Sequence, residues 1–379
     1  MTEAVQKKRF DLQIPLAVIL LAAGIFCFIF NGRFGEGVSA EAAPLIPVII
    51  LFVAGLGFLI KGGDWFVDGA TSIAERFKVP EILIGATVVS IGTTLPEVMV
   101  SAQAAAKGNS GISYGNAIGS IICNAALIAA ITLAVKPAKA KRKSLIIPIV
   151  FFFLAAGFYA FNAYVIGEFK NYTGFILLGI FLVYMFFTVR QALAQMKSEK
   201  TKEKEAEEEA QENNEEEEKK EPMPIWKALL FLVIGAAIIA FGATLLVDNG
   251  TILATKMKVP SSVIALTFVA LGTSLPELVT AITSLAKGHG ALSLGNIIGA
   301  NLFNLVLVSG LAISIHPFEV PSEKTFAGIN ASLLVDIPLV FLVMIILTFP
   351  ALFKQKLYRI QGILLLLIYA AYMAFQFLV

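Results

Sequence analysis

Two short stretches place a proline and a glutamate together inside apolar sequence: GTTLPE at residues 92–97 and GTSLPE at residues 272–277. A proline inside a helix supplies no N–H and displaces the carbonyl of the preceding turn, so each stretch predicts a helix break with free carbonyl oxygens. A carboxylate at membrane depth is costly unless it is compensated, which makes Glu97 and Glu277 candidates for function. Carboxylate and carbonyl oxygens together suit a hard cation.

Hydroxyl and amide side chains accompany both stretches. The hydroxyls belong to Ser90, Thr93, Thr94, Thr273 and Ser274. Each following segment carries three residues at four-residue spacing, which places them on one helix face: Asn116, Ser120 and Asn124, then Asn296, Ala300 and Asn304. With no cluster of Cys or His, these donors favour Ca2+ and Na+ over zinc or copper. A helix kink or a helix–helix bond explains any one of them equally well, whereas their duplication favours an ion site.

The elements that must position these residues are membrane helices. The chain has 379 residues, of which 58% are hydrophobic and 15% charged, with a mean hydropathy of +0.83, so it is predicted to be an all-α polytopic membrane protein. A spanning helix needs about 20 apolar residues. Eleven such segments are predicted, near 12–30, 45–70, 79–106, 113–135, 145–166, 172–194, 225–254, 259–286, 291–315, 327–349 and 356–378.

The first of these segments also fits a signal peptide. Lys7, Lys8 and Arg9 precede the apolar run, and VSA at 38–40 resembles a cleavage site. Because that site lies well beyond the run, a retained N-terminal transmembrane helix is favoured. The two cysteines, Cys27 and Cys123, lie inside apolar runs and are predicted to pack as small apolar residues.

An internal repeat organises the rest of the chain. Residues 85–124 align without a gap on residues 265–304, and both copies carry the GT-x-LPE stretch. Because an odd number of predicted crossings separates the copies, the second must enter the membrane from the opposite side. The predicted fold is therefore two inverted five-helix repeats plus one extra N-terminal transmembrane helix, an architecture of secondary transporters.

Four regions follow from this division. They are an N-terminal segment (1–44), a first transmembrane half (45–196), an acidic linker (197–223) and a second half (224–379). Basic residues cluster on one side of the predicted spans, so the N-terminus and the linker are expected to be cytoplasmic and the C-terminus extracytoplasmic. The linker is too charged to bury a core. Four further acids lie within or near predicted spans: Asp64, Asp68, Asp248 and Asp336. Asp68 and Asp248 match by repeat and are expected to cap or join helices, and Asp336 is expected to be a structural or pathway residue.

At the two GT-x-LPE stretches and the GN-x-x-G segments that follow, the sequence resembles the calcium/cation antiporter superfamily and, within it, prokaryotic sodium/calcium exchangers. The resemblance covers about ten of the eleven predicted helices, all but the first. It implies that Glu97 and Glu277 are the central Ca2+ ligands, with side-chain or backbone oxygens of the neighbouring residues completing the Ca2+ and Na+ sites. These further ligands are Thr93, Thr94, Thr273, Ser274, Ser120 and Asn124, and the backbone of Ser90 and Ala270.

Two positions depart from that family pattern. Ala300 stands where many members have serine, which implies one weaker ligand, and Asn304 stands where microbial and potassium-dependent members have aspartate. Two glutamates balance one Ca2+ or two Na+ without a third acid. Asn304 therefore excludes a proton-linked role for that position and argues against coupled K+ binding.

The function predicted is secondary-active exchange of Na+ for Ca2+ across the cytoplasmic membrane by alternating access, independent of K+. Ca2+/H+ exchange or K+-dependent Na+/Ca2+ exchange is the alternative within transporters, and a cation channel is the alternative from another class. The sequence predicts no enzyme activity, no cofactor and no nucleic-acid partner. The expected partners are Ca2+, Na+ and the lipid bilayer.

Overall fold

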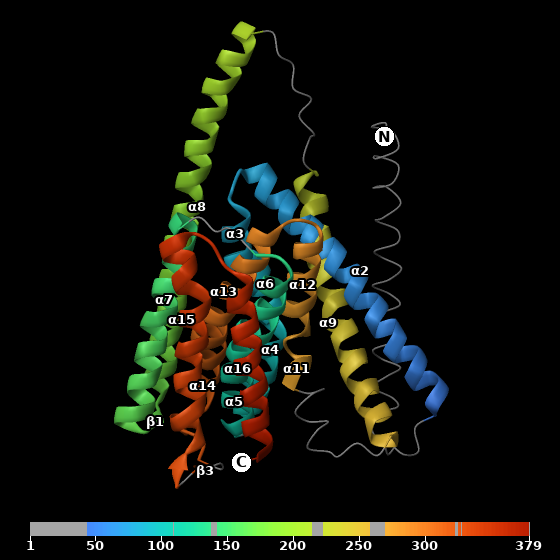
Figure 1. The fold of residues 1–379 in the computed structure, drawn as a ribbon, viewed down its shortest axis with the longest axis vertical. Coiled ribbons are helices and arrows are strands. Elements are labelled where there is room, and N and C mark those ends of the chain that lie inside the picture. The colour runs from blue at the N-terminus through green and yellow to red at the C-terminus, as the bar shows by residue number, and fades with distance from the viewer. Residues whose placement is uncertain are drawn as a thin grey trace.

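The computed structural model describes residues 44–108, 110–137, 142–213, 223–257, 270–322, 325–326 and 328–378. Within them the protein is the all-α polytopic bundle that the sequence predicts (Figure 1). Nine of the described helices are long and apolar enough to cross a membrane, and Leu275–Ala286 is a shorter apolar helix. The predicted N-terminal helix at 12–30, with Cys27, lies outside the described residues.

The first half contains five membrane-crossing segments, several of which include a π-helical turn. They are α2 (Leu45–Phe77); α3 (Glu81–Ile84), η1 (Gly85–Val89) and α4 (Ser90–Ala106); α5 (Ser110–Cys123), η2 (Asn124–Ile128) and α6 (Ala129–Val135); α7 (Arg142–Phe161) and η3 (Asn162–Ile166); and α8 (Asn171–Asn213).

The second half repeats this order. Its segments are α9 (Ile225–Lys256); α11 (Ala270–Gly272) and α12 (Leu275–Ala286); α13 (Gly290–Phe303), η5 (Asn304–Val308) and α14 (Ser309–Ile315); η6 (Ser332–Asp336) and α15 (Ile337–Lys354); and α16 (Arg359–Leu378). From α5 to α6 and from α13 to α14, the helix boundaries coincide residue for residue at the offset of the sequence repeat. The repeat is therefore structural as well as sequential.

Helices α2 and α9 form a tightly packed antiparallel pair at one side of the bundle (Figure 1). Glycines lie where they cross: a Cβ on Gly55 would lie 2.9 Å from the Gly242 carbonyl oxygen, and a Cβ on Gly62 would lie 3.0 Å from that of Gly235. Because these contacts join the two backbones directly, only small residues fit where the helices cross. Helices α2 and α9 occupy equivalent positions in the two repeats.

Helix α8 extends past the bundle at the end where α12 connects to α13, while the C-terminus lies at the opposite end (Figure 1). It remains helical as far as Asn213, through the first part of the expected acidic linker. Short antiparallel pairs join β1 (Glu168–Phe169) to β2 (Phe318–Glu319) and β3 (Thr325–Phe326) to β4 (Ile329–Asn330).

The outer surface of the bundle is apolar. Large side chains such as Ile46 and Ile60 on α2, Phe175 and Leu182 on α8, and Leu367 on α16 are exposed. Such a surface suits hydrocarbon rather than water. Polar side chains lie inside instead, and the α5–α6 and α13–α14 segments that carry the amides are the most buried of the described spans.

Candidate ion-binding site

The two GT-x-LPE stretches do not fold alike. In the second copy the helix is interrupted: α11 ends at Gly272, Thr273 and Ser274 form a turn, and Pro276 lies in the first turn of α12. In the first copy α4 runs without interruption through Pro96, which corrects the expectation of two equal breaks. The irregular turn of that segment lies earlier, in the π-helical η1.

The irregular backbone of η1 is held by a residue from outside the repeat motif. Tyr184 on α8 is fully buried, and its hydroxyl donates to the carbonyl oxygen of Ala86 in η1 at 2.8 Å. A π-helical turn leaves carbonyls displaced from their usual donors. Tyr184 therefore satisfies a carbonyl close to the candidate site, and sequence inspection did not single it out.

Two further π-helical turns begin at the asparagines that end the two amide faces. Segment η2 starts at Asn124 and η5 starts at Asn304. In the second turn the Ser309 hydroxyl also donates to the Asn304 carbonyl oxygen at 3.1 Å. Single π-helical turns are rare and gather at functional sites. Their matched position supports a role for both asparagines that the spacing in the sequence alone had suggested.

The central group consists of five residues of the repeat motifs whose polar side-chain atoms are fully buried and unpaired. Glu97, Glu277, Asn124, Asn304 and Thr94 are all 0% exposed. Among the described residues, no hydrogen-bond partner meets either carboxylate oxygen of each glutamate, either polar atom of each amide, or the Thr94 hydroxyl. Buried polar groups are almost always paired, so an unpaired set of this kind needs a ligand to explain it. Its oxygens match those that a hard cation prefers.

The carboxylates come from opposite repeats and lie close enough to repel each other. Glu277 also lies near Thr93 and Thr94 of the first repeat, and Glu97 lies near Ser274 of the second, at separations longer than a hydrogen bond. The structure therefore brings together, from both halves, residues that the sequence placed in separate motifs. Two carboxylates side by side in a buried site repel each other, so the pair needs compensation by a bound cation or by protons.

Hydroxyl groups link the two repeats across this group. Thr93 donates to Asn296 Oδ1 at 3.2 Å, and Thr273 donates to Asn116 Oδ1 at 3.1 Å. Ser274 and Ser120 contact each other through their hydroxyls at 3.3 Å. The fourth link is absent from the described residues: Thr94 occupies the position equivalent to Ser274, but Ala300 has no hydroxyl to meet it. The family departure at Ala300 thus has a visible structural effect.

Ser90 and Ala270 occupy equivalent positions at the starts of α4 and α11. The Ser90 hydroxyl donates to the backbone oxygens of Gly85, at 2.7 Å, and Asn296, at 2.9 Å, so its side chain joins α4 to α13. The ligand role expected of Ser90 belongs to its carbonyl oxygen and stays a prediction. Close contact with α13 needs Gly299, where a Cβ would collide with the Ser90 hydroxyl.

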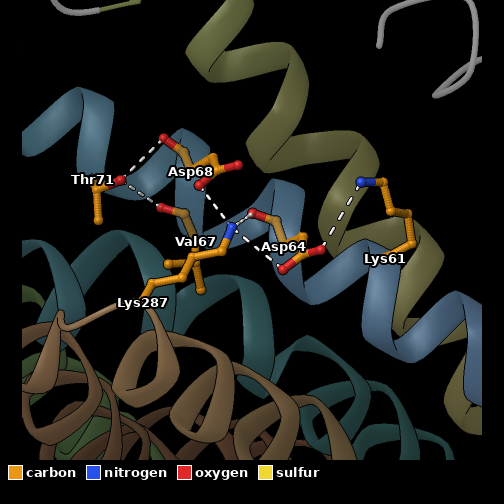
Figure 2. Close-up of polar contacts among 6 residues, drawn as sticks. All are labelled: Lys61, Asp64, Val67, Asp68, Thr71 and Lys287. Atoms are coloured by element: carbon orange, nitrogen blue, oxygen red, sulfur yellow. Dashed lines mark hydrogen bonds and ion pairs between the residues drawn. The ribbon is translucent and has the colours of Figure 1, made fainter. Parts of the chain in front are cut away.

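A separate polar cluster lies at the end of α12 and involves the further acids of α2 (Figure 2). The Lys287 ammonium lies 2.8 Å from Asp68 Oδ1 and 3.4 Å from Asp64 Oδ1, and it donates to the Asp64 carbonyl oxygen at 2.9 Å. Lys61 lies 3.9 Å from the other Asp64 oxygen. Asp64 and Asp68 thus join helices, as expected for Asp68, and neither belongs to the central group.

The remaining titratable candidates also lie in contacts between elements. Asp336 accepts from Tyr372 and Gln376 of α16, both at 3.3 Å. His289, in the connection before α13, lies 2.7 Å from Glu81. Cys123 is free and buried, as predicted. Among the described residues no group of three or more His, Cys, Asp or Glu side chains forms a metal site, so the candidate site depends on amide, hydroxyl and carbonyl oxygens beside two carboxylates.

Comparison with known proteins bears on this arrangement. A family model described as sodium/calcium exchanger protein matches residues 47–190 and 227–378, which include both repeats and leave out the acidic linker. The chain belongs to the sodium/calcium exchanger family. Members of this family are transporters and not enzymes.

Individual exchangers are similar over nearly their whole length. The sodium/calcium exchanger MaX1 of Methanosarcina acetivorans is 33% identical over 354 residues, which cover 86% of this chain and 98% of that protein. An uncharacterised membrane protein of Methanocaldococcus jannaschii is 34% identical over 330 residues, covering 86% of this chain and 96% of that protein. A solved structure of the sodium-calcium exchanger NCX_Mj superposes with a TM-score of 0.70 at 30% identity, over 87% of this chain and 99% of that one.

These likenesses confirm the fold class predicted from the sequence. The inverted five-helix repeats and the family resemblance, both read from GT-x-LPE and its neighbours, agree with the family and with the fold of its solved member. The chain is therefore a multi-pass membrane exchanger.

Proposed function

We propose that this exchanger moves Na+ in exchange for Ca2+ across the cytoplasmic membrane. The observation that carries the proposal is the set of unpaired, fully buried oxygens of Glu97, Glu277, Asn124, Asn304 and Thr94. A buried carboxylate pair needs a compensating cation, and hard oxygen donors suit both Ca2+ and Na+. The names of MaX1 and NCX_Mj, which are similar proteins, support the same pair of ions.

Glu97 and Glu277 are the central ligands in this proposal, and the oxygens around them complete sites for either ion. The ligands proposed beside them are Thr93, Thr94, Thr273, Ser274, Ser120, Asn124, Asn304 and the backbone oxygens of Ser90 and Ala270. The two carboxylates balance the charge of one Ca2+ or of two Na+. Because the Ca2+ and Na+ sites overlap and depend on the same two negative charges, the ions compete for them. This competition couples the movement of one ion to that of the other.

Transport is proposed to proceed by alternating access. The α2 and α9 pair packs backbone to backbone and lies to one side of the α4, α5, α12 and α13 core, so it can slide as a unit. Moving past a site that contains two bare carboxylates would expose uncompensated charge to an apolar surface, which is costly. The helix pair can therefore slide in the Ca2+-bound and Na+-bound forms but not in the form without ions. This restriction prevents ion leak.

Independence from K+ follows in the same proposal from Asn304, which also carries no proton-linked role at its own position. An aspartate there would add a third buried charge for K+ or a proton to compensate, whereas an amide adds none. In this proposal Na+ is the driving ion, and proton binding by Glu97 and Glu277 is the basis of the Ca2+/H+ alternative.

Flux through proteoliposomes tests the function. Uptake of radioactive Ca2+ should be driven by an outward Na+ gradient and should respond neither to K+ nor to a pH gradient alone. Stimulation by the pH gradient instead would identify Ca2+/H+ exchange, and Ca2+ flux without any counter-ion would identify a channel. Either result contradicts the proposal.

Removing one carboxylate charge tests the ligands. Glu97→Gln and Glu277→Gln keep the side-chain shape but leave a single negative charge for Ca2+, so Na+-driven Ca2+ uptake should fall by at least about a hundredfold, as expected for loss of a buried charge partner worth about 3 kcal/mol or more. Glu75→Gln, on an exposed glutamate near the end of α2, is the matched control and should transport normally. Full exchange by either site variant would remove the two glutamates from the site.

A further inference from the structure

The amide faces contain two kinds of asparagine, which the structure separates by their bonding. Asn124 and Asn304 have no side-chain hydrogen-bond partner among the described residues, as ion ligands would. Asn116 and Asn296, about two turns earlier on the same helices, are bonded to the threonines of the opposite repeat. This difference indicates separate roles for residues of the same type.

The bonds of Asn116 fix which way its amide points. Its Nδ2 donates to the Glu97 carbonyl oxygen at 3.1 Å and to Ser101 Oγ at 2.9 Å. A carbonyl oxygen only accepts, so nitrogen must occupy that side of the amide and oxygen must face Thr273. The Thr273 hydroxyl then donates its proton to Asn116 Oδ1 at 3.1 Å. With the proton committed there, the threonine lone pairs remain for another partner.

In the other half the Thr93 hydroxyl donates to Asn296 Oδ1 at 3.2 Å, the Ser90 hydroxyl lies 3.3 Å from the same oxygen, and Asn296 Nδ2 has no partner among the described residues. Two other acceptors lie near the Thr93 hydroxyl. One is the Ser90 carbonyl oxygen at 3.5 Å, a proposed Na+ ligand, and the other is the nearby Glu277 carboxylate. Without Asn296 the hydroxyl would donate to one of these two oxygens. Its proton would then point at the oxygens that hold the cation.

We propose that Asn116 and Asn296 are positioning residues that orient the threonine hydroxyls of the opposite repeat, so that Thr273 and Thr93 present lone pairs and not protons to the transported cation. The inference rests on the proposed function, because it concerns the same ions. It also gives the two asparagines a reason to lie on the site face without being ligands. Each bond crosses between repeats, so it also sets the position of one half-site relative to the other.

A double-mutant cycle on the apparent KM for Na+ tests this role. Asn296→Leu removes the acceptor at similar side-chain size, and Thr93→Val removes the hydroxyl that it orients. Asn296→Leu alone should raise the apparent KM for Na+ by about three- to tenfold, the range of one net hydrogen bond. In the Thr93→Val background the same change should shift the KM by less than about twofold, since the hydroxyl to be oriented is gone. Asn116→Leu with Thr273→Val forms the second cycle.

Asn171→Leu is the matched control, because this exposed asparagine donates to the Ser314 carbonyl oxygen at 3.1 Å, away from the central group, and its loss should leave the KM unchanged. Thermal unfolding in detergent shows whether each variant is folded, and Asn→Ala replaces any Asn→Leu variant that is not. An equal rise in the apparent KM for Na+ with and without the threonine hydroxyl would overturn the proposal. Asparagines that act only on helix packing would have the same effect in both backgrounds.

The same double-mutant cycle can be measured as the rise in the thermal unfolding midpoint that Ca2+ causes in the purified protein. This measurement does not depend on transport. If the wild type shows no Na+-driven flux, the proposed function fails on its own, and the stabilisation cycle still tests the asparagines. Coupling between asparagine and threonine in that measurement supports the positioning role, and additive effects overturn it.

Discussion

At the scale of single residues, the two halves of the site differ in the hydroxyl contacts that they make. Ser274 meets Ser120, whereas Thr94, its equivalent, has no partner among the described residues because position 300 is alanine. The site is therefore built from a duplicated motif but is not symmetric. Ion affinity should depend on this difference, since an unpaired buried hydroxyl is oriented only by the ion itself.

Ala300→Ser should restore the missing link. A serine hydroxyl there can bond Thr94 as Ser120 bonds Ser274, and the apparent KM for Na+ should fall by about threefold, within the range of one net hydrogen bond. The measurement is Na+-driven Ca2+ uptake at varied Na+. Ser120→Ala, which removes the existing link, should raise the KM instead. A rise in KM with Ala300→Ser would show that the alanine is required by packing.

At the scale of helices, the α2 and α9 pair is defined by where its glycines lie. A Cβ on Gly235 would lie 2.6 Å from the Phe66 backbone nitrogen, whereas a Cβ on Gly57 would meet no described atom within 4 Å. The first glycine is required by the helix contact and the second is not. The pair thus behaves as one element only while its backbones remain in contact.

Gly235→Ala should therefore force α2 and α9 apart. We expect a loss of stability of about 1–3 kcal/mol, as for an overpacked core, seen as a lower midpoint of thermal unfolding in detergent, together with slower exchange. Gly57→Ala is the matched control on α2 and should retain both properties. An unchanged midpoint for Gly235→Ala would mean that the two helices separate without cost.

The ion pairs of Lys287 join α2 to the core at the end of α12 (Figure 2). If α2 slides during transport, these contacts must break in one of the two access states, so they favour the state in which they form. The side chains are partly exposed, at 26% for Lys287 and 39% for Asp68, so screening limits the contribution to about 1 kcal/mol.

Lys287→Met should shift the balance between access states by a few-fold. The apparent Ca2+ affinities measured from the two sides of oriented vesicles should then change in opposite directions. Asp68→Asn should change them in the same way as Lys287→Met. Lys170→Met removes an equally short ion pair, 2.8 Å to Glu168, that lies within one connection, so it should leave the ratio unchanged. Parallel changes on both sides would indicate loss of stability and not a shifted equilibrium.

At the scale of the whole molecule, the acidic extension of α8 and the C-terminus lie at opposite ends of the bundle (Figure 1). This arrangement accords with a cytoplasmic linker and an extracytoplasmic C-terminus, the orientation expected from the basic residues. The same orientation places the Lys287 cluster on the cytoplasmic side, since the α12–α13 connection lies at the α8 end.

Labelling with a membrane-impermeant thiol reagent tests the orientation. In a background without Cys27 and Cys123, Lys170→Cys should react in intact cells, because the α7–α8 connection is expected outside. Lys136→Cys, an exposed position at the end of α6, should react only after lysis. The reverse pattern would invert the proposed topology.

The sequence by itself determined much of the architecture. Apolar runs of membrane length predicted the spans, and the aligned repeats predicted the inverted halves, because these features are local or periodic and need no knowledge of contacts. The pairing of Pro and Glu with amide-bearing helices likewise identified the family. The predicted segment at 259–286 is described only from residue 270, and the first predicted helix lies wholly outside the described residues.

Only the tertiary structure decided how equivalent residues differ. The same motif forms a continuous helix at Pro96 and an interrupted one at Pro276, and asparagines of one stripe divide into bonded Asn116 and Asn296 and unpaired Asn124 and Asn304. These outcomes depend on partners far away in the chain, such as Tyr184 against η1 and Thr273 against Asn116. Spacing along a helix sets which face a side chain occupies, but what meets that face is set by the packing of the whole bundle.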